Sequence, residues 1–172
     1  MSSPMPKYRY KSVLDISVED LHKMGAKAVA LDIDNTICND GKENCIDGLE
    51  DWIANVQNAG IRVMILSNAM PRRPKNLSKR LGIPYISMAR KPKSHKLIKA
   101  ANMMGVKIQE LAMVGDQLFA DIQAANDCGA IAICVEPLKG ETRFKKFYEK
   151  RRAKEAPVLA EFEKLHGFGY YD

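Results

Sequence analysis

Residues 27–36 read Lys-Ala-Val-Ala-Leu-Asp-Ile-Asp-Asn-Thr, an apolar segment that ends in two carboxylates one residue apart. Leu31 and Ile33 have the alternation of a buried strand, so Asp32 and Asp34 stand where apolar side chains would otherwise continue the core. Carboxylates are rarely buried without a partner. Ligands bind at the carboxyl ends of strands in an open α/β sheet, where a carboxylate pair needs a cation or a shared proton. The segment therefore predicts a catalytic site with a bound cation, for which we expect magnesium.

Outward from this segment, apolar segments of β type alternate with longer segments of helical period. The β-type segments are expected at residues 28–33, 61–66, 85–88, 111–114 and 130–135. The helical segments are expected at about 47–60, 75–81, 94–104 and 118–128. Ser94 is the expected N-cap of the third, and Gly82 and Gly129 are expected to end the second and fourth. This order predicts an α/β fold, a Rossmann-like three-layer sandwich with a central parallel sheet.

The length of 172 residues and the hydrophobic content of 46% are typical of about one ordinary domain with a sizeable core. We expect one domain over residues 1–172, with an N-terminal arm at about 1–16 and a basic C-terminal helical tail at about 139–172. Pro157 is expected to break that tail into two helices. No apolar run approaches the ~18 to 20 residues of a membrane span and no signal-like stretch begins the chain, so we expect a cytoplasmic protein.

The four cysteines are Cys38, Cys45, Cys128 and Cys134. They form no C-x-x-C pair, and Cys134 lies in an apolar segment with no histidine near it in the sequence to share a metal. We therefore expect reduced thiols and no disulfides.

The basicity of the chain is local. Residues 139–154 hold eight Lys or Arg against two Glu, so this segment alone accounts for the net charge of +6. A basic segment of this kind either attracts phosphates, anionic lipid or nucleic acid, or is a solvated helix face. The sequence slightly favours the solvated face.

Polar residues follow three further apolar segments at the points where those segments end. A Ser-Asn pair at 67–68 could clamp a phosphate, although both residue types are ordinary turn formers. Lys91 could project a cation over the same edge of the sheet. Asp116, with Asp121 five positions later, would bring a further carboxylate to the cation.

Taken together, the motifs have a family resemblance. Four of them follow in order: Asp32-Ile33-Asp34-Asn35-Thr36, Ser67-Asn68, Lys91-Pro92, and Gly115-Asp116 with Asp121. This order resembles the four motifs of the haloacid-dehalogenase superfamily of phosphotransferases, over roughly residues 28–135. The fuller strings 31–36, 89–92 and 114–121 resemble the small bacterial YqeG-like phosphatases of the capless subfamily IIIA, relatives of the mitochondrial phosphatidylglycerophosphate phosphatases.

The resemblance implies phosphoryl transfer through an aspartyl-phosphate. Asp32 would be the nucleophile, and Asp34 would protonate the leaving oxygen and then deprotonate the attacking water. Mg²⁺ would be held by Asp32, Asp116 and the backbone carbonyl of Asp34. An acid at position 34 favours a hydrolase over a pump-like ATPase.

The phosphate oxygens would be bound by Thr36, Ser67, Asn68 and Lys91. Thr36 could instead orient Asp34 or the backbone. Lys93 competes with Lys91 for the role of phosphate-binding lysine, but the pair Lys91-Pro92 fits the family pattern better. Asp121 would hold Lys91 or a water on the metal, or it is no more than an acid in the first turn of a helix.

The spacing of the motifs leaves no room for a cap domain, so the substrate itself must close an open site. That favours phosphates on large molecules or surfaces. The leading hypothesis is a Mg²⁺-dependent phosphomonoesterase that converts phosphatidylglycerophosphate to phosphatidylglycerol at the inner face of the membrane. Residues 143–154 would contact anionic lipid, and Arg72 and Arg73 would meet a headgroup or be solvated.

Two alternatives remain open. One is a capless phosphatase of a soluble sugar phosphate, nucleotide or phosphoprotein. The other is a catalytically inactive module that binds RNA or ribosomes through its basic tail, against which the intact acidic pair argues. Nucleic acid is not the favoured partner, and the sequence leaves the oligomeric state open.

Overall fold

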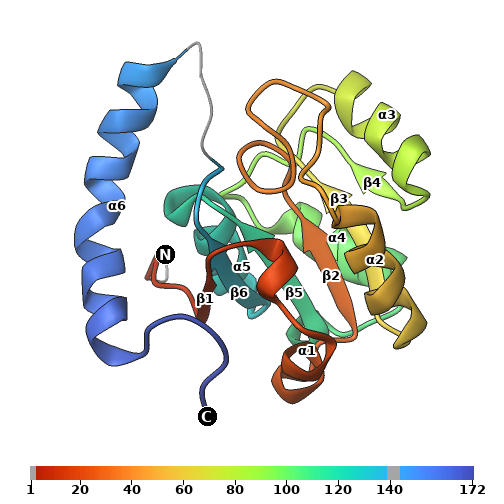
Figure 1. Cartoon of the computed structure of the whole chain (residues 1–172), viewed down its shortest axis with the longest axis horizontal. Helices are drawn as coiled ribbons and strands as arrows, with labels where there is room; N and C mark the ends of the chain where they lie inside the picture. The colour runs from red at the N-terminus through yellow and green to blue at the C-terminus, as the bar shows by residue number, and fades with distance from the viewer. Residues whose placement is uncertain (1–2, 139–143) are drawn as a thin grey trace.

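The computed structural model describes residues 3–138 and 144–172, which form a six-stranded sheet with helices on both faces (Figure 1). The strand order is β1-β6-β5-β2-β3-β4, and every pairing is parallel. The strands are β1 (Tyr8–Tyr10), β2 (Ala28–Leu31), β3 (Arg62–Leu66), β4 (Tyr85–Ile86), β5 (Leu111–Gly115) and β6 (Ile131–Val135). The expected α/β fold with a central parallel sheet is confirmed.

Helices join the strands in the order that the sequence predicts. The α-helices are α1 (Val18–Met24), α2 (Leu49–Asn58), α3 (Arg72–Leu81), α4 (His95–Met103), α5 (Gln123–Cys128) and α6 (Lys145–Leu165). Shorter turns are η1 (Val13–Asp15), η2 (Ile108–Glu110) and the π-helical η3 (Leu118–Ile122). Gly82 and Gly129 end α3 and α5 in the left-handed conformation, as expected.

Each face of the sheet has its own apolar cluster, because successive side chains of a strand point to opposite faces. Val29 and Leu31 of β2 pack in one cluster with α2, where Trp52 is buried and donates from Nε1 to the Ile16 carbonyl at 2.8 Å. Ala28 and Ala30 pack in the other cluster with α4 and α5. The three-layer arrangement follows from this division.

Ser94 occupies the N-cap position of α4 but does not cap the helix with its side chain. Its backbone is helical (φ −94°, ψ −12°), whereas capping needs an extended residue. The hydroxyl donates instead to the Ala124 carbonyl at 2.8 Å. Ser94 therefore ties α4 to α5.

Part of the expected N-terminal arm is an edge strand of the sheet. β1 pairs with β6, with Tyr8 opposite Ile133 and Tyr10 opposite Val135. A strand of three residues is too short to show a period in the sequence. The Tyr8 ring packs on the Tyr170 ring, with 5.4 Å between the centroids. The contacts that fix β1 thus come from the far end of the chain. The expectation that residues 1–172 form one domain stays a prediction.

The expectation that Pro157 breaks the basic tail into two helices is wrong. One helix, α6, runs from Lys145 to Leu165 with Pro157 inside it. Proline removes the hydrogen bond to the carbonyl four residues earlier, which belongs to Ala153. Both Ala153 and Pro157 are exposed, so water can satisfy that carbonyl. The first residues of the expected tail, 139–143, lie outside the described residues.

Within the described parts of the chain, no helix combines the length and the apolar character that crossing a membrane requires.

Packing of α6 on the domain is expected to depend on Phe162, whose residue is 1% exposed, whereas Leu165 is 63% exposed on the same helix. Phe162→Ala should lower the free energy of unfolding by about 3–5 kcal/mol in urea denaturation, because it leaves a cavity. Leu165→Ala should cost less than about 0.5 kcal/mol. Equal effects of the two changes would mean that α6 is not packed through Phe162.

Candidate active site

Three neighbouring strands deliver their polar residues to one edge of the sheet. β2 lies between β3 and β5, with Leu31 opposite Ile65 on one side and Val114 on the other. Asp32 follows β2 directly, and its N–H donates to the Val114 carbonyl at 3.0 Å. Asp116 follows β5 directly. Strand order therefore brings together residues that are far apart in sequence.

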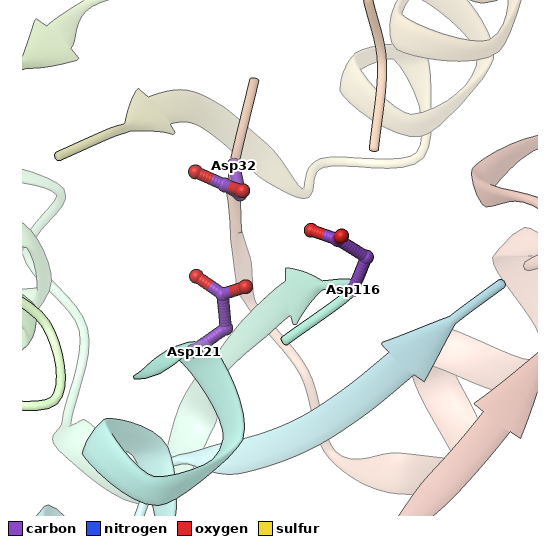
Figure 2. A group of neighbouring side chains, drawn as sticks. All are labelled: Asp32, Asp116 and Asp121. Atoms are coloured by element: carbon purple, nitrogen blue, oxygen red, sulfur yellow. The ribbon is translucent and has the colours of Figure 1, made fainter. Parts of the chain in front are cut away.

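The core of the candidate site is an acidic cluster of Asp32, Asp116 and Asp121. One carboxylate oxygen from each lies within 4.8 Å of the others, and all three residues are buried. Figure 2 shows the three side chains turned toward one another from three separate segments. Asp121 reaches the cluster from η3, where its Oδ2 accepts from the Gln117 N–H at 3.1 Å.

The side chain of Asp121 lies against Gly115, the last residue of β5. A Cβ built on Gly115 would lie 2.2 Å from the Asp121 Cγ, so any side chain at position 115 would displace the carboxylate. Glycine is required here by this close approach and not by its backbone angles.

Lys91 supplies a buried cation to two of the three carboxylates. Its Nζ lies 3.0 Å from Asp32 Oδ1 and 2.6 Å from Asp121 Oδ1, and it donates to the Leu66 carbonyl at 2.9 Å. Lys93, the alternative lysine, is exposed. The geometry brings Lys91, and not Lys93, into the site.

Asn68 holds the loop that carries Lys91. Its Oδ1 accepts from the Lys91 N–H at 2.8 Å and its Nδ2 donates to the Lys91 carbonyl at 3.1 Å. Asn68 was expected to bind phosphate, but its amide is engaged by the backbone. Ser67 is buried at the wall of the same pocket, and its Oγ accepts from the Ala69 N–H at 3.1 Å.

Thr36 was expected to bind phosphate or to orient Asp34. It is buried, and its Oγ1 donates to Asp116 Oδ1 at 3.2 Å. A hydroxyl that is directed at a carboxylate of the cluster fixes the direction of that carboxylate. The structure therefore makes Thr36 a support of Asp116.

Asp34 lies at the pocket but outside the acidic cluster. Its Oδ1 accepts from the Gly41 N–H at 2.9 Å, in the loop between β2 and α2. Arg73 of α3 forms an ion pair with the same carboxylate, with Nη2 at 2.5 Å from Oδ1, and also donates to the Lys42 carbonyl. Arg73 is thus paired with Asp34 in the structure and is not the solvated side chain that the sequence allowed.

α6 closes the other side of the site, which sequence reasoning did not foresee. Arg152 forms an ion pair with Asp116 Oδ2, donates to the Asp116 carbonyl at 2.8 Å and pairs with Glu155 at 2.7 Å. Glu155 is buried and accepts from the Leu118 N–H at 2.6 Å. Tyr148 and Arg151 of the same helix line the pocket. Nothing in the sequence of the tail distinguishes these residues from its other charges.

Burial and mutual repulsion raise the proton affinity of the cluster. Burial raises the pKa of Asp32 well above its usual range, with Asp121 adding to the shift and Lys91 opposing it. Burial, again with Asp121 adding, raises the pKa of Asp116 to about 7, while Arg152 opposes the shift. Burial alone would lower the pKa of Lys91, but Asp121 and Asp32 raise it above its usual value. Lys91 and Arg152 therefore do not fully neutralise the negative charge of the three carboxylates.

A divalent cation fits this donor set. Buried carboxylate oxygens are the ligands that Mg²⁺ takes, and three of them converge here. The pocket beside them has a volume of about 280 Å³. It is lined by Asp32, Asp34, Ser67, Asn68, Ala69, Lys91, Gln117, Ala120, Asp121, Tyr148 and Arg151. Carboxylates, hydroxyl and cations around one hollow are suited to the transfer of a phosphoryl group.

Comparison with known proteins agrees with this chemistry. A family model described as mitochondrial PGP phosphatase matches residues 2–139. A protein of Bacillus subtilis strain 168 described as probable phosphatase YqeG is 33% identical over 151 residues, which cover 86% of this chain and 88% of that protein.

Solved structures share the fold. The 3-deoxy-D-manno-octulosonate 8-phosphate phosphatase of Moraxella catarrhalis, solved with magnesium, phosphate and KDO, has a TM-score of 0.50 at 18% identity, over 86% of this chain and 98% of that chain. The cobalt-bound phosphatase YrbI of Haemophilus influenzae has a TM-score of 0.50 at 17% identity, over 81% of this chain and 93% of that chain.

Cation binding at the acidic cluster should strengthen with pH. The pKa of Asp116 is about 7 in the folded state, against ~3.9 for an aspartate in an unfolded chain. Between these values the folded state binds more protons, so the metal-free protein loses stability as pH rises. A cation must displace the proton and gains affinity over the same range.

The measurement is the shift in melting temperature on addition of about 10 mM MgCl₂. We expect a rise of about 3–5 °C at about pH 8 and less than about 1 °C at about pH 5.5, for a cation concentration near ten times its Kd. Asp116→Asn is the control and should remove both the shift and its pH dependence. Shifts of equal size at the two pH values would contradict cation binding at this cluster.

Proposed function

The chain belongs to the mitochondrial PGP phosphatase family, whose members are phosphatases of the haloacid-dehalogenase type, and we propose that it is a Mg²⁺-dependent phosphomonoesterase that works through a phosphorylated Asp32. The observation that carries the proposal is the convergence of Asp32, Asp116 and Asp121 on one buried point, with Lys91 beside them. Bound at these carboxylates, Mg²⁺ would supply positive charge that relieves repulsion between Asp32 and the phosphate oxygens.

Asp32 is the group that we assign to attack phosphorus. It lies at the end of β2, where the buried strand fixes its position, and Lys91 holds its Oδ1 at 3.0 Å. We assign the attack to Oδ2. Lys91 and Ser67 then stand beside the equatorial oxygens of the phosphoryl group, whose charge must be stabilised in the transition state. Thr36 and Asn68 act through Asp116 and Lys91.

Asp34 is the acid and base in this proposal. Arg73 and the Gly41 N–H hold its carboxylate at the pocket wall. Proton transfer to the leaving oxygen requires a carboxylate oxygen that is not engaged by Arg73. An entering phosphate is an anion that can draw the Arg73 guanidinium away, because guanidinium binds phosphate and carboxylate in the same way. Substrate binding would thereby free Asp34 for its role.

We propose phosphatidylglycerophosphate as the substrate, met at a membrane surface. A second hollow of about 320 Å³ adjoins the catalytic pocket and shares Arg151 with it. Phe119 and Phe147 line this hollow together with Lys150 and Lys154. The Arg151 guanidinium lies 4.6 Å from the Phe147 ring centroid.

Aromatic rings mixed with cations suit a lipid whose headgroup is anionic and whose tail is apolar. Phe147 is 58% exposed and Phe144 is 62% exposed, so both rings present apolar surface near the start of α6 that a lipid could contact. Arg143, the first residue of the segment expected to contact lipid, lies outside the described residues. The lipid proposal therefore rests on the described part of α6.

A soluble phosphomonoester is the second candidate substrate. The catalytic pocket itself has mostly polar and charged lining residues and is large enough for a phosphate with a small polar group. Hydrolysis of phosphatidylglycerophosphate in vesicles should be compared with a panel of soluble sugar phosphates, nucleotides and phosphopeptides, with and without Mg²⁺. Turnover of the lipid above every soluble compound supports the proposal. Faster cleavage of a soluble compound replaces the lipid, and no Mg²⁺-dependent turnover at all favours the inactive RNA-binding alternative.

Asp32→Asn should reduce phosphatase turnover by at least about 10³-fold, because the amide is not a nucleophile that can form the phosphoenzyme. Acid quenching during turnover of a labelled substrate should trap phosphate on residues 28–42 of the wild type only. Asp51→Asn, at an exposed position of α2, is the control and should keep normal turnover. Full turnover by Asp32→Asn would exclude the aspartyl-phosphate.

Arg151→Gln should raise the KM for phosphatidylglycerophosphate diluted in zwitterionic vesicles by about tenfold, because a charge-assisted contact in the pocket is lost. Lys146→Gln removes the same charge from an exposed position of α6 outside the pocket, so its KM should change less than about twofold. Equal effects of both changes would mean that α6 attracts the surface only by its overall charge.

A further inference from the structure

The loop between β2 and α2 carries two cysteines that lie opposite each other. Cys38 and Cys45 form an isolated antiparallel bridge, and the flanking Ile46 N–H donates to the Ile37 carbonyl at 2.8 Å. This pattern places the cysteines at a non-hydrogen-bonded position, where opposite side chains come closest. Their sulfur atoms are 2.7 Å apart. The backbone spacing of such a pair falls in the range that a disulfide spans without movement of the chain.

The surroundings give the two thiols different reactivities. Arg80 of α3 donates from Nη2 to the Cys45 sulfur at 2.9 Å, and in Figure 1 this loop runs beside α3. The Cys38 thiol and then Arg80 lower the pKa of Cys45 to about 7, although burial and Glu50 oppose the shift. Cys45 is half-buried and lines a surface hollow of about 430 Å³ that Arg80 shares. Cys38 is buried behind it.

We propose that Cys38 and Cys45 are an oxidation site that closes to a reversible disulfide, with a hydroperoxide as the oxidant. The Cys45 thiolate attacks the terminal peroxide oxygen, so the O–O bond breaks, sulfenic acid forms and hydroxide leaves. Hydroxide takes the proton that ionisation of Cys45 had released. The Cys38 sulfur then attacks the Cys45 sulfur, giving up its proton, and water leaves. Two thiols and hydrogen peroxide thus yield one disulfide and two waters.

The disulfide would fix the loop next to Asp34. The Asn35 N–H donates to the Cys38 carbonyl at 2.8 Å, and the Gly41 N–H between the cysteines donates to Asp34. Oxidation would therefore restrain the turn that contacts Asp34. The oxidation site itself is independent of the function proposed above, because it rests on the two thiols and Arg80 alone.

Trypsin gives a direct test, because it cleaves after Lys42, between the two cysteines. Cys38 falls in peptide 28–42 and Cys45 in peptide 43–62, whereas Cys128 and Cys134 share peptide 108–139. The native protein is treated with hydrogen peroxide, blocked with N-ethylmaleimide, digested without reductant and analysed by mass spectrometry. We expect peptides 28–42 and 43–62 joined by a disulfide, at least about tenfold above the untreated protein, and separated by dithiothreitol.

Three variants assign the roles. Cys38→Ser should accumulate sulfenic acid at Cys45, which dimedone traps, and Cys45→Ser should give no adduct at Cys38. Cys128→Ser, a half-buried thiol away from the loop, is the matched control and should still form the link. Peptide 43–62 carrying sulfinic acid with no link to 28–42, or no reaction of either peptide while 108–139 is oxidised, would overturn the proposal. This outcome is read on the wild type, so a variant that fails to fold leaves the test intact.

Discussion

Three carboxylates that are buried within reach of one another repel, and much of the molecule is arranged around that repulsion. Asp32, Asp116 and Asp121 are brought together by the order of β2, β5 and η3. The three residues are buried, so cations placed beside them are the main relief of this repulsion. Lys91 takes two of the carboxylates and Arg152 takes the third. Each of these two cations then needs structure of its own to hold it.

Supports for the cations account for features that are otherwise unconnected. Asn68 binds both backbone groups of Lys91, so the end of β3 sets the position of a lysine that follows β4. Glu155 holds Arg152 and also satisfies the first N–H of η3, which links α6 to the segment that carries Asp121. Two separate features thus hold the site residues in position: the order of the strands and the packing of α6. The cations placed in this way suit phosphoryl transfer, because positive charge beside a carboxylate favours its anionic form next to an anionic substrate.

Sequence predicts the part of this arrangement that is local. A strand that ends in an acid is visible as apolar residues followed by Asp32, and the expected segments match β2 to β6 and the helices between them. Long-range contacts of single residues leave no such pattern. Arg73, Arg152 and Glu155 are charges among many in the sequence, and only folding shows that they meet Asp34 or Asp116. The bonds of Thr36 to Asp116 and of Asn68 to Lys91 leave no pattern in the sequence for the same reason.

α6 is synthesised after every strand of the sheet, because it follows them all in the sequence. Domains form from the N-terminal side as the ribosome extends them. The sheet and its three carboxylates are therefore synthesised before Arg152 and Glu155 leave the ribosome. A nascent chain presents the acidic cluster with Lys91 as its main protein counter-charge, and free ions have access to Asp116 before α6 arrives. Until Arg152 arrives, Asp116 therefore has no guanidinium partner, and the cluster carries more unrelieved negative charge than in the finished protein.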